Sequence, residues 1–209
     1  MRFDRHRLVW IDPQRWPAIL AAHGLANAPA LLADWARDDR PLIARRPVVG
    51  ELPCLVPLGL PLPPSIGKQR LAFAVPPDAI RADAPPPLLR DAAAAAPPAW
   101  QDSIAALVTL DPDTRCFGSL AWAHLTGLAY LSPGSDLDLL WTVADQRTAT
   151  ARARALLTIG ATVPMRIDGE LLTPQGHAVQ WREWASDAPE LLVKAAHANG
   201  VTPRASVFA

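Results

Sequence analysis

Apolar residues are spaced as in a helix over residues 100–110, in the second half of the chain. Asp145 is a suitable cap for a second helix over residues 146–159, which Gly160 would end. We therefore expect two longer helices in this half.

Caps and prolines predict shorter helices elsewhere. One begins at Asp12-Pro13 and another at Asn27-Ala-Pro29. A third covers residues 88–96, between two groups of prolines. Asp187, which has a glutamate three residues on, predicts a last helix that ends near Gly200.

Alternating apolar residues predict strands between these helices. Residues 136–141 have strand length and an apolar alternate face, and residues 69–75 form the clearest strand of the first half. Residues 165–184 predict a hairpin around residues 174–176. The second half then has the order strand, helix, strand, helix, hairpin, which fits a small α+β palm against a mixed sheet.

A region rich in proline and alanine, residues 76–98, separates the two halves. Before it, residues 40–75 alternate extended segments with proline turns. We expect a smaller N-terminal α+β domain over residues 1–86 and a main domain over residues 87–209. The predicted fold class is α+β.

The composition argues against several classes of protein. The chain has 209 residues, and its 20 basic and 20 acidic residues give a formal net charge of zero, so it has no overall attraction to nucleic acid or anionic membranes. No apolar run approaches membrane-spanning length, and we expect a soluble cytoplasmic protein. Two cysteines and five histidines show no zinc-binding spacing. Cys116 is expected to be a small buried packing residue rather than a nucleophile.

Candidate chemistry is concentrated in residues 117–138. Gly118 and Ser119 follow a short strand and open a helix predicted over residues 120–131. Glycine lets a phosphate approach the backbone, and the start of a helix offers free N–H groups to it. Asp136 and Asp138 lie on the same side of the next strand, where two carboxylates suit Mg²⁺. A phosphate holder and a metal holder would then face each other.

Alone, an Asp-x-Asp pair is a weak signal. The alternative is that Ser135 and Asp136 cap a turn and that Asp138 is a solvated residue at the end of a strand. The apolar residues that follow make this segment resemble a core strand, in which two unpaired acids on one face would be costly.

A third acid would complete a two-metal site and accept the proton of the attacking hydroxyl. Arg166, Asp168 and Glu170 share one face of the next predicted strand. If this strand neighbours the first acidic strand, Asp168 is the first choice and Glu170 the second. The alternative is that Asp168-Gly169 forms a tight turn.

A triphosphate also needs cationic side chains around its leaving group. The candidates are Arg45, Arg46, Lys68 and Arg70. The segment 65–68 resembles part of a phosphate loop but lacks its earlier glycine, so we interpret it as a turn that presents Lys68 and Arg70 to an interdomain cleft. For each residue taken alone, a solvated surface charge is an equally good interpretation.

Gly118-Ser119 followed by Asp136-Leu-Asp138 resembles the signature of the polymerase-beta-like nucleotidyltransferases. Over most of its length the chain is also similar to the phosphoribosyl-dephospho-CoA transferases of malonate decarboxylase, also called holo-acyl-carrier-protein synthases. The segments that carry this second resemblance are residues 40–47, 56–70, 117–122, 168–170 and 181–184.

This resemblance implies an enzyme that transfers a group from 2′-(5″-triphosphoribosyl)-3′-dephospho-CoA to a serine of the apo acyl carrier protein subunit, releasing pyrophosphate. It implies that Asp136, Asp138 and Asp168 hold Mg²⁺ and that Gly118 and Ser119 fix the triphosphate. The N-terminal domain would bind substrate and residues 87–209 would be catalytic. The alternatives are another metal-dependent nucleotidyltransferase that uses ATP on a small molecule or protein, or a non-catalytic nucleotide-binding module.

Overall fold

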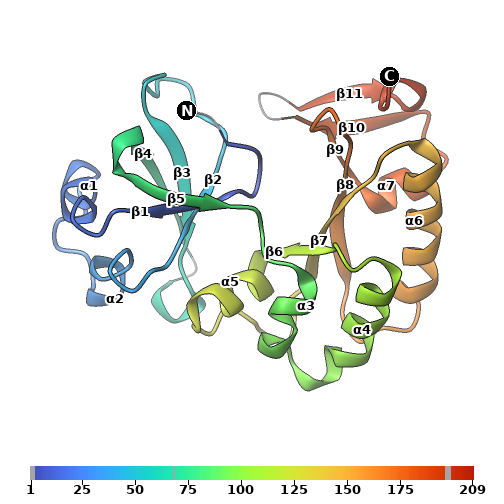
Figure 1. Cartoon of the computed structure of the whole chain (residues 1–209), viewed down its shortest axis with the longest axis horizontal. Coiled ribbons are helices and arrows are strands. Elements are labelled where there is room, and N and C mark those ends of the chain that lie inside the picture. The colour runs from blue at the N-terminus through green and yellow to red at the C-terminus, as the bar shows by residue number, and fades with distance from the viewer. Residues whose placement is uncertain (1–2, 68, 196–198) are drawn as a thin grey trace. The chain divides into compact units, whose positions relative to one another are not determined.

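The computed structural model describes residues 3–67, 69–195 and 199–209 (Figure 1). The chain folds as two units, Met1–Pro86 and Pro87–Ala209. Each unit has its own sheet with helices, which confirms the predicted α+β class. In the part of the chain that the structure describes, no helix has the length and apolar character needed to cross a membrane.

The N-terminal unit is built on a five-stranded antiparallel sheet with the order β4-β3-β2-β1-β5. Its strands are β1 (Leu8–Ile11), β2 (Leu42–Ala44), β3 (Val56–Pro61), β4 (Arg70–Val75) and β5 (Ile80–Ala84). Its helical segments are α1 (Trp16–Ala22), α2 (Ala30–Ala33), η1 (Pro64–Ile66) and η2 (Pro77–Ala79). The two predicted helices and the strand at residues 69–75 are confirmed, whereas β1 and β5 were not predicted.

Two tryptophans fix the short helices of this unit to its sheet. Trp16 is buried beside Phe73, with ring centroids 5.2 Å apart, and its Nε1 donates to the Leu32 carbonyl at 2.8 Å. Trp35 is fully buried, and its Nε1 donates to the Pro41 carbonyl at 3.0 Å. Burial of these rings with their N–H groups satisfied compensates for the shortness of the helices.

The C-terminal unit contains a six-stranded mixed sheet with the order β11-β10-β9-β8-β7-β6. Its strands are β6 (Arg115–Phe117), β7 (Leu137–Thr142), β8 (Ile167–Leu172), β9 (Ala178–Gln180), β10 (Glu190–Lys194) and β11 (Asn199–Pro203). Strands β7 and β8 are parallel, and the other pairs are antiparallel. The parallel pair is possible because a long helix connects its two strands.

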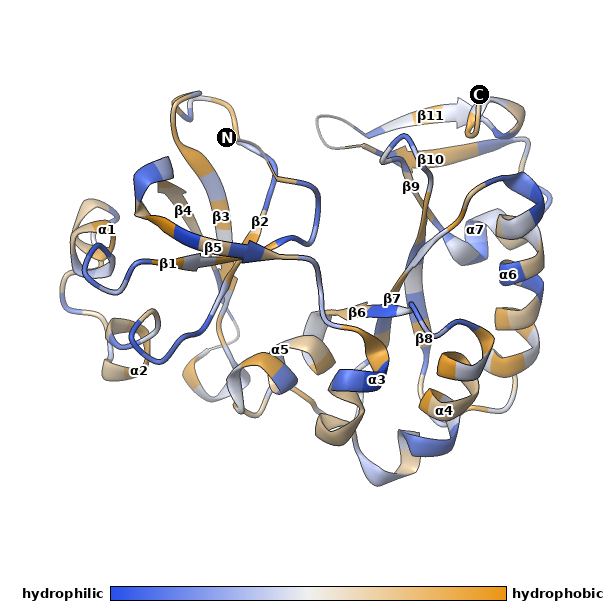
Figure 2. Cartoon of the chain, in the orientation of Figure 1, coloured by the Kyte–Doolittle hydropathy of each residue, from blue (hydrophilic) through white to orange (hydrophobic). Residues whose placement is uncertain are grey.

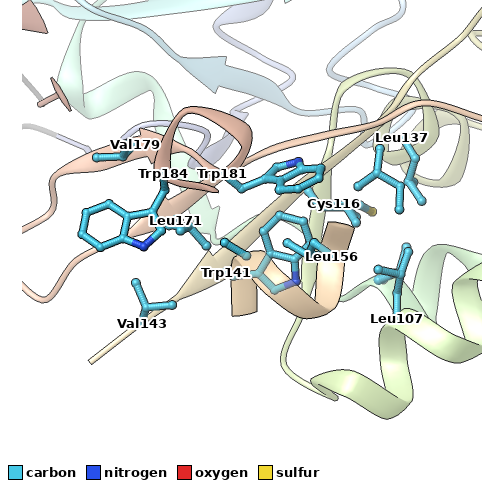
Figure 3. Packing of buried hydrophobic residues seen from close by; sticks show 14 of the residues in the cluster. Leu107, Cys116, Leu137, Trp141, Val143, Leu156, Leu171, Val179, Trp181 and Trp184 are labelled. Carbon is cyan, nitrogen blue, oxygen red and sulfur yellow. The ribbon is translucent and has the colours of Figure 1, made fainter. Parts of the chain in front are cut away.

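Helices cover the apolar face of this sheet. They are α3 (Leu89–Ala92), α4 (Gln101–Leu110), α5 (Gly118–Thr126), α6 (Gln146–Gly160) and α7 (Trp181–Ala185), with the short turns η3 (Ala93–Ala95), η4 (Pro98–Trp100) and η5 (Arg204–Ser206). Hydrophobic and hydrophilic residues alternate along α6 (Figure 2), and its buried members are Ala149, Ala153 and Leu156. They join one cluster with Trp141, Trp181, Trp184 and the apolar residues of the strands (Figure 3).

Several predicted elements in this unit are confirmed. Helix α4 covers residues 101–110, and Asp145 caps α6 by accepting a hydrogen bond from the Thr148 N–H at 2.7 Å. Helix α5 is shorter than predicted, because Gly127 takes a left-handed conformation with φ of 68° and ends it at Thr126.

Near the C-terminus one prediction is confirmed in part and another is wrong. The expected hairpin around residues 174–176 is present as β8 and β9, but it ends at Gln180 and α7 follows from Trp181. The expected helix from Asp187 to Gly200 is instead the strand pair β10 and β11 over its described residues. Leu191 and Val193 are buried on alternate positions of β10, so the segment follows the period of a strand.

Candidate active site

The candidate site begins where β6 meets α5. Strand β6 ends at Phe117 and α5 begins at Gly118, whose φ of 64° lies in the left-handed region. A Cβ at this position would approach the Asp138 carboxylate, with Asp138 Cγ only 2.8 Å away. Both the backbone conformation and the close approach therefore require glycine.

Asp138 lies at the centre of three neighbouring strands. It pairs with Phe117 on β6 and with Asp168 on β8. Leu137 and Leu139, on either side of it in the chain, are fully buried in the core. Asp138 therefore belongs to the opposite face of the sheet, where it is half-buried. Asp136 is half-buried directly before the first residue of β7.

The structure places the Asp168 strand beside the acidic strand, which was the condition for choosing Asp168 as the third acid. Asp168 is half-buried, and its Oδ1 accepts the Gly169 N–H at 2.9 Å and the Gln180 Nε2 at 2.8 Å. The alternative of a tight turn at Asp168-Gly169 is wrong, because both residues lie inside β8. A Cβ on Gly169 would lie 2.9 Å from the Leu139 carbonyl carbon, so glycine here allows β8 to approach β7.

Glu170, the second choice for the third acid, forms an ion pair with Lys194. Its side chain is 6% exposed, and its Oε1 accepts the Lys194 Nζ at 2.8 Å. Removing a partner from a buried ion pair is costly, so Glu170 is less available to an incoming cation than Asp168 is.

The acids suit Mg²⁺ by their chemistry, since all offer hard carboxylate oxygens. The absent side chain of Gly118 leaves space beside one of them, Asp138. Among the residues that the structure describes, no three acidic, histidine or cysteine side chains are grouped as a ready metal site. The expectation that Asp136, Asp138 and Asp168 hold metal therefore stays a prediction.

The start of α5 has the properties of an anion site. Its N-cap residue, Phe117, makes no side-chain cap hydrogen bond, and Ser119 is the second residue of the helix. Uncapped N–H groups at a helix start attract phosphate through their hydrogens and the helix dipole. This helix start adjoins the Asp138 carboxylate through Gly118.

The four predicted cations of the N-terminal unit differ in their surroundings. Arg45 donates to both carboxylate oxygens of Glu51 and to the Leu58 and Phe73 carbonyls, so its guanidinium holds the β2–β3 loop in place. Arg46 has two guanidinium nitrogens, Nε and Nη2, that are buried without a hydrogen-bond partner among the described residues. Arg70 is exposed at the start of β4, and Lys68 lies outside the described residues.

The sequence did not assign roles to Gln180, Lys194 or Arg166. Gln180 bonds to Asp168, and Lys194 pairs with Glu170. Arg166 is exposed directly before β8, and its carbonyl accepts the Leu137 N–H at 2.8 Å, so it lies next to Asp136 in the register. The one sequence signal that could have identified Arg166 as a site residue was its position on the same predicted strand face as Asp168.

Cys116 is a packing residue, as predicted. It is fully buried on the core face of β6, opposite Leu139. Burial raises the pKa of its thiol to about 12, with a smaller contribution from the negative charge of Asp138. The thiolate needed for nucleophilic attack is therefore suppressed.

These features together define a class of protein. A helix start beside carboxylates on paired strands combines an anion site with hard oxygen ligands, which suits an enzyme that acts at phosphate groups. Models for the phosphoribosyl-dephospho-CoA transferase MdcG N-terminal and C-terminal domains match residues 4–86 and 88–205. The chain belongs to this phosphoribosyl-dephospho-CoA transferase family, and it is a transferase.

Relatives support this membership over almost the whole length. A phosphoribosyl-dephospho-CoA transferase of Bradyrhizobium diazoefficiens is 42% identical over 194 residues, covering 91% of this chain and 85% of the relative. One from Xanthomonas campestris pv. campestris is 38% identical over 208 residues, covering 98% and 96%. No solved structure matches the chain.

Proposed function

We propose that this transferase moves the 2′-(5″-phosphoribosyl)-3′-dephospho-CoA group from its triphosphate precursor to a serine of the apo acyl carrier protein subunit of malonate decarboxylase. The family membership supports the coenzyme-derived donor. The observation that carries the phosphate chemistry is the contact of Gly118 with Asp138, which joins a helix start to an acidic strand. Together they describe a site for a phosphorylated substrate and a cation.

In the proposed reaction, the serine oxygen of the carrier attacks the α-phosphorus of the precursor. The bond between this phosphorus and the oxygen leading to the β-phosphorus breaks, and pyrophosphate leaves. The serine proton passes to a carboxylate of the site, for which Asp168 is the first candidate. The product is a phosphodiester between the carrier serine and the prosthetic group.

The residues of the C-terminal unit divide this work. The N–H groups at the start of α5 and the Ser119 hydroxyl bind the triphosphate and orient it for attack in line. Asp136, Asp138 and Asp168 hold Mg²⁺, which when bound supplies Lewis acidity at the phosphates and lowers the pKa of the attacking hydroxyl. Arg166, beside Asp136 in the register, adds a positive charge near the phosphates.

The N-terminal unit binds substrate in this proposal. Arg46 is its best candidate for an anion contact, because an arginine with buried, unpartnered nitrogens gains most from a phosphate partner. Arg70 and Lys68 are further candidates. Arg45 is less suited, since its bonds to Glu51 would have to break first.

Mass spectrometry of the purified apo carrier subunit tests the proposal. After incubation with the enzyme, Mg²⁺ and the triphosphoribosyl precursor, the carrier should gain the mass of the prosthetic group, and a carrier with the acceptor serine replaced by alanine should not. A parallel reaction with ATP is the control for a general nucleotidyltransferase. Robust use of ATP without coenzyme labelling of the carrier would contradict the proposal, as would a complete lack of transfer with either donor.

A further inference from the structure

Gln180 links the candidate acid Asp168 to the start of α7. Its Oε1 accepts the N–H groups of Arg182 at 2.6 Å and Glu183 at 2.9 Å, which makes it the cap of the helix. Its Nε2 donates to Asp168 Oδ1 at 2.8 Å. One amide group thus serves two elements at the junction of β9 and α7.

The cap determines which way the amide points. A glutamine side chain has one acceptor oxygen and one donor nitrogen, and the two helix N–H groups can be satisfied only by the oxygen. Rotating the amide by half a turn would set its NH₂ group against both N–H donors. The nitrogen must therefore face Asp168 as long as the helix is capped.

The helix itself is firmly held. Trp181 and Trp184, the first and fourth residues of α7, are fully buried or nearly so in the core of the unit. Arg182 stacks over the Trp181 ring at 4.3 Å and donates to the Ile167 carbonyl of β8 at 3.2 Å. The orientation of the Gln180 amide is thus tied to the packed core.

Asp168 is oriented in turn. Its Oδ1 accepts two hydrogen bonds, from its neighbour Gly169 and from Gln180. Among the described residues Oδ2 has no such partner, so it is the oxygen left for a ligand. Groups that orient a ligating carboxylate in this way usually set its affinity for a metal ion.

We propose that Gln180 is a positioning residue, which holds the Asp168 carboxylate with Oδ2 available to a divalent cation. The inference rests on the proposed function, because it takes Asp168 as a ligand. Gln180 touches neither substrate nor metal in this proposal and acts through Asp168 alone. Its removal should therefore weaken metal binding only where Asp168 is present.

The test is a double-mutant cycle read by Mn²⁺ titration calorimetry on the full chain. Gln180→Thr keeps an N-cap oxygen for α7 but is too short to reach Asp168, whereas Gln180→Met loses both contacts at similar volume. We expect each to lower Mn²⁺ affinity by about tenfold. In an Asp168→Ala background, neither should lower the affinity further.

A cap variant elsewhere controls for general destabilisation. Asp145→Ala removes the cap of α6, which is outside the site, and should lower thermal stability without changing Mn²⁺ affinity. Wild-type affinity in Gln180→Thr, or an equal loss in both Asp168 backgrounds, would overturn the positioning role alone. If the unmodified protein binds no Mn²⁺, the proposed metal site and this inference both fail.

Discussion

Gly118 packs directly against Asp138, so the first residue of α5 and the central acid of β7 occupy one site with no room for a side chain between them. A Cβ at Gly118 would lie 2.8 Å from Asp138 Cγ, and the glycine φ of 64° is one that side chains rarely adopt. This contact couples the helix start, where phosphate would bind, to the carboxylate that would hold the cation.

Gly118→Ala should therefore reduce both stability and transfer. The added methyl group must displace the Asp138 carboxylate while the backbone stays strained, at a cost of about 2–4 kcal/mol in the free energy of unfolding. We expect the rate of pyrophosphate release to fall by at least about tenfold. A displacement of about 1 Å in a reacting group can lower a rate by about 100-fold. Chemical denaturation and a pyrophosphate assay measure the two effects.

Gly127→Ala is the matched control. Gly127 has a similar φ of 68°, but a Cβ there would meet none of the residues that the structure describes within 4 Å. Its replacement by alanine should lower the free energy of unfolding by about 1 kcal/mol through backbone strain and leave the transfer rate unchanged. If the two variants lost activity equally, contact with Asp138 would not be the cause.

Elements that are determined by interactions between residues close together in the chain could be predicted from the sequence. Asp145 caps α6 through a neighbour three residues away, and the apolar residues of β7 alternate with its acids, so both elements could be predicted from short windows of sequence. The pairing of β8 with β7 was only a condition in the sequence analysis, and the register meets it.

Elements that depend on distant partners escaped prediction. Asp187 and Glu190 have the spacing of a helix cap, but the residues after them pair with β9 and β11 instead. Strand β5 follows a proline-rich turn and is specified by its pairing with β1, far back in the chain. The hairpin that places β9 beside β8 was predicted, but the bond from Gln180 to Asp168 was not, because residues 181–184 were expected to continue the hairpin and instead form α7, which Gln180 caps.

The two candidates for the third acid should separate in stability and activity. Asp168→Asn keeps an oxygen to accept from Gly169 and Gln180, so stability should change little, whereas transfer should fall about 100-fold or more through loss of the charge. Glu170→Gln breaks a largely buried ion pair with Lys194 and should cost roughly 2–3 kcal/mol in unfolding free energy. Its kcat below the unfolding temperature should stay within a few-fold of wild type.

The reverse pattern would make Glu170 the functional acid. Turnover and thermal unfolding should be measured on the same preparations. The control is the double variant that combines Lys194→Met with Glu170→Gln. This double variant replaces both charges, so it should recover part of the stability lost in Glu170→Gln.

Replacing Arg45 and replacing Arg46 in the N-terminal unit should have different effects on stability and on substrate binding. Arg45→Gln removes the bonds to Glu51 and to three backbone carbonyls, which should lower the free energy of unfolding by about 2–3 kcal/mol. Arg46→Gln removes buried nitrogens that have no partner among the described residues, so it should change stability little. In the proposed function, Arg46→Gln raises the KM for the precursor by about tenfold, the equivalent of one charged hydrogen bond. An unchanged KM would remove Arg46 from the substrate site.

Acid should weaken the N-terminal unit through Glu51. The hydrogen bond from Arg45 holds the pKa of this carboxyl below its ordinary value of 4.5. Because the folded state binds this proton more weakly than the unfolded state, the stabilisation is fully present above pH 4.5 and is lost as the pH falls below it. Glu51→Gln should flatten this part of the stability profile, measured by urea unfolding between neutral and acid pH. An identical slope in wild type and variant would show that Glu51 contributes nothing to it.

Alkaline pH should act through Cys116 in the opposite direction. Burial raises the pKa of this thiol from 9.0 to about 12, so between these values the unfolded state loses a proton that the folded state keeps. Stability from this group is therefore intact below pH 9.0 and declines as the pH rises above it. Urea unfolding from pH 8 to 11 should show a steeper decline for the wild type than for Cys116→Ala, after allowance for the cavity.

A thiol reagent at pH 8 should label only the exposed Cys54 in the folded protein and both cysteines after denaturation. Rapid labelling of Cys116 in the folded protein would show that β6 is more open than the structure has it.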